Sequence, residues 1–364
     1  MKPNIFIIGS TGTLGSMLLS YCYKNKIQIF GISCFKNKSK LISQSKKYNI
    51  NNLFSLSSTE DIGNFYKFLS INKIHIIYFL DTSSYSIEHL QQFNKFQKNS
   101  LIAIANKELI IACGPLLNKF TKKSNNKVIP MDSEHFSLLN SNFTNSLINK
   151  IYITASGGPF YFNKSINLIN VSTNEVLAHP KWKMGINNSI DSSNFVNKVL
   201  EIFELCHLYD IDLDKIDFLI SREAYIHSII EYKDSTTQIN CFHNNMIIPM
   251  IKPLTSFYDL NLSLIKSNKK YLDYKNLIIE ERNDKRFLIF NYLKKIKNFN
   301  HNQQILFLLL NKKAHNLYLS GNLQYENIIK YIFYNIKFFS TSKKLNTFKD
   351  VIKYIYLLEK KFLS

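Results

Sequence analysis

The sequence predicts an α/β protein with a parallel β-sheet in its N-terminal part and a small bundle of helices in its C-terminal part. The chain has 364 residues, which fits two or three domains at roughly 100–200 residues each. Its first third alternates short β-rich runs with helix-length polar or amphipathic stretches, a pattern typical of βαβ units. From about residue 286 onward, apolar residues recur at the three- and four-residue steps of a helix.

Six β-rich runs are the expected strands. Those of the N-terminal sheet are Asn4–Ile8, Gln28–Ser33, Ile74–Leu80 and Leu101–Ala105. Two further runs, Lys150–Ala155 and Phe218–Ile220, flank a long helical stretch and predict a second α/β region. The charged segment 264–285 is the expected linker to the helices. The last helix begins at a capping-box-like pair, Thr347 and Asp350.

The net charge of +20 raises the question of a nucleic-acid partner. Only Arg222, Arg282 and Arg286 among the 46 basic residues are arginines, whereas proteins that bind bases and phosphates commonly use the planar arginine fork. Ile, Asn, Phe and Tyr, which share A/T-rich codons with Lys, are also abundant. We therefore interpret the charge as a coding bias and expect no nucleic-acid partner.

Neither a membrane span nor a disulfide framework is expected. The longest clean apolar runs, such as 305–310, are far shorter than the roughly 20 residues that a membrane helix needs. The five cysteines form no CxxC pair and their number is odd, which argues against structural disulfides or zinc. The N-terminus lacks the pattern of a signal peptide. We expect a cytoplasmic protein, or a mature one from which a presequence was removed.

A glycine-rich segment, 9–15, follows the first expected strand and precedes a helix-like stretch, Ser16–Tyr23. Glycines at such a turn let the backbone approach a pyrophosphate, which then rests on the helix N-terminus. This context predicts a Rossmann-like dinucleotide-binding domain, with an ordinary tight turn as the alternative. Lys36 and Lys38 follow the second strand, where an acid would favour NAD, so they favour NADP. The alternative is that lysine is simply common in this chain.

Two acidic residues follow the apolar run Val128–Met131. If the backbone is extended there, Asp132 and Glu134 face the same way and their carboxylates converge. Such a pair repels unless a cation lies between the two groups, and oxygen ligands favour Mg²⁺ or Mn²⁺. A solvated acidic turn is the alternative.

The segment 191–201 combines groups that suit a phosphate ligand. Asp191 or Ser192 is expected to cap a helix on which Asn197, Lys198 and Glu201 are surface neighbours. A hydroxyl near the helix start, an amide and an ammonium group can all bind phosphate. Taken singly, Lys198 and Glu201 would be an exposed ion pair.

The only tryptophan, Trp182, lies in a polar segment bracketed by proline and glycine, 178–185. Loops near binding sites often close over ligands, so this segment is a candidate lid. Anchoring of the ring in the core is the alternative.

Together these motifs resemble the 1-deoxy-D-xylulose 5-phosphate reductoisomerase family. The resemblance is carried by GSTGTLG at 9–15, ANKE at 105–108, DSEH at 132–135, TASGGPF at 154–160, AHPKWKMG at 178–185 and DSSNFVNKVLE at 191–201. It implies rearrangement and NADPH-dependent reduction of 1-deoxy-D-xylulose 5-phosphate to 2-C-methyl-D-erythritol 4-phosphate in non-mevalonate isoprenoid biosynthesis. It also implies a divalent metal, Mg²⁺ or Mn²⁺, and a homodimer.

The resemblance assigns roles to individual residues. As metal ligands it implies Asp132, Glu134 and Glu201, which together with Lys107 would be catalytic. As substrate contacts it implies Lys107, Ser133, Glu134, Ser156, His179, Trp182, Met184, Ser192, Asn197, Lys198, Glu201 and His227. As cofactor contacts it implies Gly9, Ser10, Thr11, Gly12, Thr13, Leu14, Lys36, Asn37, Asn106, Glu108 and Gly185.

The expected organisation is an NADPH-binding domain at 1–131, an α/β catalytic domain at 132–263, the linker at 264–285 and a helical domain at 286–364. The sequence departs from the family pattern in four segments: 80–84, 221–224, 245–250 and 311–315. Two rival functions stay open. One is an NADP-dependent reductase of another phosphorylated substrate, and the other is a degenerate basic nucleic-acid-binding protein.

Overall fold

The computed structural model describes residues 2–82, 86–141, 147–178, 185–260, 277–337 and 343–362. The chain forms two compact units. The first contains Met1–Leu139 and Asn245–Lys270, and the second contains Asn140–Asn244 and Tyr271–Ser364. In the described parts of the chain, no helix is both long and apolar enough to cross a membrane.

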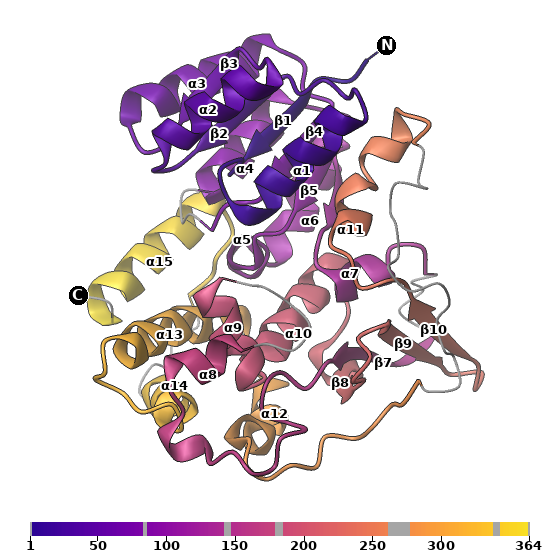
Figure 1. Ribbon diagram of the computed structural model, residues 1–364, viewed down its shortest axis with the longest axis vertical. Coiled ribbons are helices and arrows are strands. Elements are labelled where there is room, and N and C mark those ends of the chain that lie inside the picture. Colours follow the sequence, from indigo (N-terminus) through magenta and orange to yellow (C-terminus); the bar gives the residue numbers. More distant parts are fainter. Residues whose placement is uncertain are drawn as a thin grey trace. The chain divides into compact units, whose positions relative to one another are not determined.

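The first unit is built on a six-stranded parallel sheet in the order β3-β2-β1-β4-β5-β6 (Figure 1). Its strands are β1 (Ile5–Ile8), β2 (Gly31–Cys34), β3 (Asn52–Ser55), β4 (Ile76–Phe79), β5 (Leu101–Ile104) and β6 (Lys127–Pro130). All residues of β1 and β4 are buried, as expected of parallel strands covered on both faces. The strand order reverses next to β1, so the turn after β1 lies where open α/β sheets bind their ligands.

Helices follow the strands and cover this sheet (Figure 1). They are α1 (Thr13–Lys24), α2 (Lys38–Tyr48), α3 (Thr59–Ile71), α4 (Ser86–Phe96), α5 (Lys107–Cys113), α6 (Pro115–Ser124) and α7 (Ser133–Ser137). The returning segment adds α11 (Ile247–Ile251) and a 3₁₀ turn, Leu254–Ser256, which pack against the same core as β1 and α1. The Tyr78 hydroxyl on β4 donates to the Met250 carbonyl at 2.8 Å. The first unit is therefore completed by residues far along the chain.

The second unit contains a four-stranded mixed sheet in the order β10-β9-β7-β8. β7 pairs parallel to β8 and antiparallel to β9, and β9 pairs antiparallel to β10. The strands are β7 (Ile148–Ala155), β8 (Ile216–Ile220), β9 (Ile226–Tyr232) and β10 (Thr237–Cys241). The connection from β7 to β8 contains α8 (Thr173–Leu177), α9 (Ile186–Ser193), α10 (Val196–Tyr209) and two 3₁₀ turns, Leu168–Asn170 and Leu213–Lys215.

The end of the chain is helical, as predicted. It comprises a 3₁₀ turn (Leu288–Tyr292), α12 (Leu293–Ile296), α13 (His301–Leu319), α14 (Asn327–Lys337) and α15 (Phe348–Phe362). The predicted cap of the last helix is confirmed, because the Asp350 N–H donates to Thr347 Oγ1 and the Thr347 N–H donates to Asp350 Oδ2. α13 packs against both α14 and α15.

The predicted α/β fold is confirmed. The four predicted strands of the first unit are shorter than expected, whereas β7 and β8 are longer. β2 begins at Gly31, three residues after the predicted start. The predicted domain boundaries stay a prediction. Residues 264–276 of the expected linker lie outside the described residues, and in its remaining part Glu280 pairs with Ile220 of β8 through two 2.8 Å backbone hydrogen bonds.

Asp217 on β8 forms ion pairs with two basic side chains of the second unit. Its carboxylate lies 2.7 Å from Arg282 Nη1 and 2.5 Å from Lys297 Nζ. Burial opposes ionisation, but the hydrogen bond from Lys297 and the charge of Arg282 outweigh it and lower the pKa of Asp217. The ionised form is therefore favoured by folding.

We expect Asp217→Asn to lower the free energy of unfolding by about 2 kcal/mol at neutral pH, because a buried charge-assisted contact is lost. A carboxyl whose pKa is lower in the folded state stabilises fully above its unfolded pKa of about 4, so the deficit should shrink as the pH falls from there through the lower folded-state pKa. Urea unfolding of both proteins across this range measures it, and a deficit that does not change with pH would contradict the assignment.

Candidate functional site

The turn between β1 and α1 contains glycines that no other residue could replace without movement. Gly9 has a φ of +83°, and a Cβ there would lie 2.7 Å from the Asp81 backbone nitrogen. A Cβ on Gly15 would lie 2.4 Å from the Gly9 carbonyl oxygen. Gly12 occupies the N-cap position of α1 and has no side chain with which to cap it. The turn and the first N–H groups of α1 thus fit the pyrophosphate of a dinucleotide.

The predicted cofactor contacts Lys36 and Asn37 lie between β2 and α2. Asn37 caps α2, since its Oδ1 accepts the Lys40 N–H at 3.0 Å. Lys36 is exposed, and Lys38 Nζ lies 3.8 Å from the Asp61 carboxylate. Thr13 and Leu14 form the first turn of α1.

Two residues of α2 that are not among the predicted site residues contact the glycine turn. Lys40 Nζ donates to the Thr11 carbonyl at 2.7 Å, and the Gln44 amide donates to the Ser10 carbonyl at 2.8 Å. Lys40 and Gln44 are four residues apart and share one helix face. That spacing from the Asn37 cap is the signal that could have pointed to them.

The predicted contacts Asn106, Lys107 and Glu108 lie at the same edge of the sheet, after β5. Asn106 is buried and caps α5 through its Oδ1, which accepts the Leu109 N–H at 2.8 Å. Its Nδ2 donates to Ser86 Oγ at 3.2 Å, and this hydroxyl donates to the Asp81 carboxylate at 2.9 Å. Lys107 and Glu108 form the first turn of α5 and are half-buried.

The carboxylates of Asp132 and Glu134 converge as predicted, within 4.8 Å of each other, but the backbone between them is not extended. Asp132 follows β6 but caps α7, so Glu134 lies on a helix rather than on an extended segment. The side chain of Asp132 accepts the Glu134 N–H at 3.1 Å, and Ser133 Oγ donates to Glu134 Oε2 at 2.5 Å. The buried His135 ring lies 3.6 Å from Asp132 through Nδ1. The positions of the two carboxylates are therefore determined by the start of α7 and not by the alternation of side chains along a strand.

In the second unit, the predicted helix cap at Asp191 or Ser192 is wrong. Both residues lie inside α9, and α10 starts after Phe195, whose φ is +65°. This left-handed residue separates the two helices. The loop after β7 passes close by, since a Cβ on Gly158 would lie 2.7 Å from the Ser192 carbonyl oxygen.

The three predicted residues of α10 are neighbours, as expected. Lys198 Nζ lies 2.7 Å from Glu201 Oε2, and Asn197 Nδ2 donates to Glu201 Oε1. Lys198 is 8% exposed and Glu201 is 1% exposed. The alternative of an exposed ion pair is therefore wrong. Charged residues are rarely buried unless they are paired, as these two are.

The remaining predicted residues are placed as follows. His227 on β9 is buried, its Nε2 is hydrogen-bonded to the Phe242 carbonyl at 3.2 Å, and its ring stacks on that of Phe242. Ser156 lies in the loop after β7 and Gly185 is the N-cap residue of α9. His179, Trp182 and Met184 lie outside the described residues.

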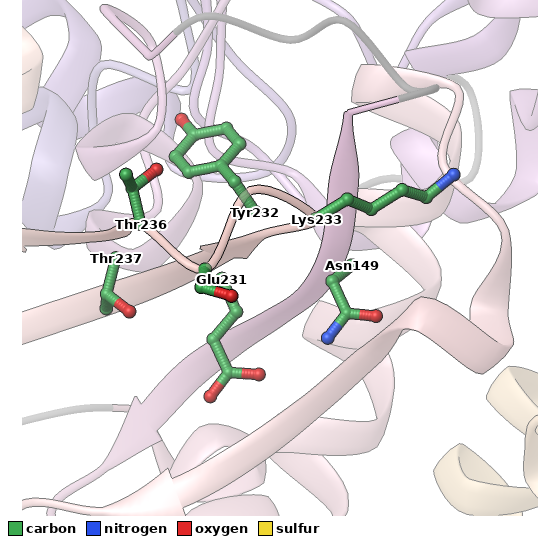
Figure 2. Close-up of a pocket in the computed structure, with 7 residues that line it drawn as sticks. Asn149, Glu231, Tyr232, Lys233, Thr236 and Thr237 are labelled. Atoms are coloured by element: carbon green, nitrogen blue, oxygen red, sulfur yellow. The ribbon is translucent and has the colours of Figure 1, made fainter.

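A pocket in the second unit is separate from all of these residues (Figure 2). It surrounds the turn between β9 and β10 and is lined by Asn149, Glu231, Tyr232, Lys233, Ser235, Thr236 and Thr237. The charged groups of Glu231 and Lys233 extend in different directions (Figure 2). None of the predicted site residues lines this pocket, so we do not assign the site to it.

Residues 128–209 match the model of the 1-deoxy-D-xylulose 5-phosphate reductoisomerase C-terminal domain. The chain is 32% identical over 237 residues to the 1-deoxy-D-xylulose 5-phosphate reductoisomerase of Pelagibacter ubique, which covers 64% of this chain and 60% of that protein. It is 32% identical over 265 residues to that of Wolbachia pipientis wMel, covering 70% of this chain and 66% of that protein. The alignments thus span about 60 to 66% of these relatives.

Two solved structures share the fold over nearly the whole chain. One is 1-deoxy-D-xylulose 5-phosphate reductoisomerase from Zymomonas mobilis in complex with NADPH, with a TM-score of 0.81, 19% identity and coverage of 100% of this chain and 98% of that one. The other is DOX-P reductoisomerase in complex with NADPH, fosmidomycin and magnesium, with a TM-score of 0.83, 21% identity and coverage of 99% and 97%.

We expect Asp132→Asn to weaken Mn²⁺ binding about tenfold or more without lowering stability, because asparagine caps helices as well as aspartate but is a poor ligand for a hard cation. Titration calorimetry and thermal unfolding measure the two properties. Asp61→Asn in α3 is the matched control and should leave Mn²⁺ binding unaltered. Equal Mn²⁺ affinity for Asp132→Asn and the unmodified protein would rule out this carboxylate as a ligand.

Proposed function

Because this chain belongs to the 1-deoxy-D-xylulose 5-phosphate reductoisomerase family, we propose that it converts 1-deoxy-D-xylulose 5-phosphate to 2-C-methyl-D-erythritol 4-phosphate with NADPH and a divalent cation. The observation that carries the proposal is the buried Lys198–Glu201 pair on α10. It lies within the segment that matches the family model, and its charges suit a phosphorylated, metal-chelating substrate.

Asp132, Glu134 and Glu201 are the proposed metal ligands, and each of them carries a carboxylate. Their hard oxygen atoms fit Mg²⁺ or Mn²⁺. When bound, the metal supplies Lewis-acid stabilisation of negative charge on the substrate oxygens. Lys198 and Asn197 keep the Glu201 carboxylate oriented through their hydrogen bonds, and Ser133 does the same for Glu134.

The phosphate of the substrate is proposed to bind at Ser156, Ser192, Asn197 and Lys198. The close approach of the Gly158 loop to Ser192 supports a common site for the two hydroxyls. Binding a remote phosphate holds the reacting carbon atoms in place and supplies orientation. Lys107, Ser133 and His227 are proposed as further contacts, and His179, Trp182 and Met184 as contacts from the lid segment.

NADPH is proposed to bind at the β1–α1 turn, with Gly9 to Leu14 around the phosphates, and at Lys36, Asn37, Asn106, Glu108 and Gly185. The glycine geometry and the start of α1 support this assignment. The cofactor supplies hydride when bound. The role of the chain is to orient the nicotinamide and to exclude water from it.

The experiment that tests the proposal is NADPH oxidation by the purified protein with 1-deoxy-D-xylulose 5-phosphate, with and without Mg²⁺ or Mn²⁺. We expect oxidation that requires both substrate and metal, and 2-C-methyl-D-erythritol 4-phosphate as the product. Oxidation with other sugar phosphates alone would favour a different reductase. Salt-dependent binding of DNA or RNA without NADPH oxidation would favour the nucleic-acid-binding alternative.

A homodimer and a cytoplasmic location belong to the same proposal. The family assignment supports the dimer, and five free cysteines are consistent with a reducing compartment. Light scattering on the purified protein measures the mass of the particle directly.

Glu201→Gln should lower turnover on the order of a hundredfold or more, because a neutral amide is a poor ligand for a hard dication. Glu175→Gln on α8, whose carboxylate is exposed and caps that helix, is the control and should keep full turnover. Steady-state rates at limiting and saturating Mn²⁺ test this, and near-normal turnover of Glu201→Gln at limiting metal would remove Glu201 from the ligands.

NADPH should be preferred over NADH, because a cation at Lys36 can contact the 2′-phosphate. A charge-assisted contact of about 1.5–3 kcal/mol corresponds to roughly 10–150-fold in affinity. Lys36→Ala should reduce this preference, whereas Lys38→Ala should change it less because Lys38 already lies near Asp61. The ratio of kcat/KM for the two cofactors measures it. Equal values in the unmodified protein would contradict the prediction, and a loss confined to Lys38→Ala would move the role to Lys38.

A further inference from the structure

We propose that Gln44 of α2 is a positioning residue for the cofactor, because its amide holds the β1–α1 turn in the shape that receives NADPH. This inference rests on the proposed function. It concerns a side chain that does not belong to any of the motifs by which the family was recognised.

The amide of Gln44 makes a reciprocal pair of hydrogen bonds with one residue of the turn. Its Nε2 donates to the Ser10 carbonyl at 2.8 Å, and its Oε1 accepts from Ser10 Oγ at 2.9 Å. The same Nε2 lies 3.3 Å from Ser16 Oγ in α1. One side chain of α2 therefore contacts both the turn and the helix that follows it.

These contacts are buried, which makes them strong determinants of the backbone shape. Ser10 is 0% exposed and Gln44 is 6% exposed. The Ser10 carbonyl accepts from Gln44 Nε2 at 2.8 Å and from Ser16 Oγ at 3.4 Å. Loss of the amide would therefore leave this buried oxygen with its longer contact alone. Without the amide, the peptide between Ser10 and Thr11 would gain by rotating towards another donor. That rotation would move the N–H groups that the cofactor phosphates are proposed to contact.

The other contacts of the turn do not replace this one. The N–H groups of Gly9 and Ser10 both donate to the Ser33 carbonyl of β2, at 3.1 and 2.9 Å. They attach the start of the turn to the sheet and do not hold the Ser10 carbonyl. Ser16 Oγ does donate to that carbonyl, but at the longer distance of 3.4 Å. Lys40 Nζ contacts the next carbonyl, that of Thr11, but it is an exposed and flexible group. The buried amide is thus the group that fixes the middle of the turn.

The experiment compares three variants of the full chain with the unmodified protein. Gln44→Met keeps the size of the side chain and removes both hydrogen bonds. Gln44→Glu keeps the acceptor and supplies a donor only when its carboxyl is protonated. Gln97→Met is the matched control, because Gln97 is also buried and its amide also bonds to backbone, but at Leu69, Asn72 and Ile74, at the opposite end of the strands. Titration calorimetry measures NADP⁺ binding, and thermal unfolding measures stability.

We expect Gln44→Met to raise the Kd for NADP⁺ about tenfold or more. Gln97→Met should lower Tm by as much as Gln44→Met does, but it should leave this Kd within twofold. The Gln44→Glu variant should show a pH dependence that a purely structural role would not produce. Burial raises the pKa of a carboxyl, so its Kd relative to the unmodified protein should be near 1 at about pH 5 and rise roughly tenfold by about pH 8. Taking the ratio at each pH removes the titration of the 2′-phosphate.

Three results would overturn the inference. An unchanged Kd in a folded Gln44→Met refutes the positioning role while the proposed cofactor stands. If Gln44→Met does not fold, a flat Kd ratio for Gln44→Glu across the pH range refutes it. If the unmodified protein does not bind NADP⁺, the proposed function fails and the inference fails with it.

Discussion

The burial of Glu201 beside Lys198 is the constraint around which the second unit is organised. Transfer of two charges out of water costs several kcal/mol per ion unless geometry and additional hydrogen bonds compensate. The chain meets this requirement by placing both residues on one turn of α10, within the crossover that joins two parallel strands. The left-handed Phe195 lets α10 start next to Ser192 rather than continue α9. A core built for stability alone would have used apolar residues there.

The first unit positions its predicted site residues through backbone structure rather than through buried charges. The strands β1, β2, β5 and β6 all end at one edge of the sheet, and the segments that follow them carry predicted cofactor and metal residues. Several of these residues are occupied as helix caps, as Asn37, Asn106 and Asp132 show. The capping bonds fix the start of each helix and leave the neighbouring groups facing the edge. The predicted residues are therefore held in position by the ends of helices, where few backbone torsions are free.

Much of this arrangement was predictable from the sequence, but only where the structural role of a residue depends on its near neighbours along the chain. The glycines of 9–15 and the Asn197–Lys198–Glu201 spacing were such cases, because turn geometry and helix periodicity act over a few residues. Strand β3 was missed because the half-exposed edge segment Asn52–Ser55 has no apolar run. The cap at Phe195 was also missed, since a bulky residue rarely adopts a positive φ. The contacts of Gln44 could not be predicted for another reason. Its partners in the turn and in α1 lie 34 and 28 residues away along the chain, and no periodicity indicates such a contact.

The return of the chain to the first unit has a consequence for the order of events during synthesis. Ile247, Met250, Ile251 and Leu254 belong to the same apolar cluster as β1 and α1, and Tyr78 bonds to a residue 172 positions later. When the ribosome has released only the N-terminal 139 residues, this apolar cluster still lacks the part of its cover that α11 provides. The nascent chain must hold that apolar surface exposed while more than a hundred further residues are translated, and such surfaces are where chaperones bind and aggregation begins.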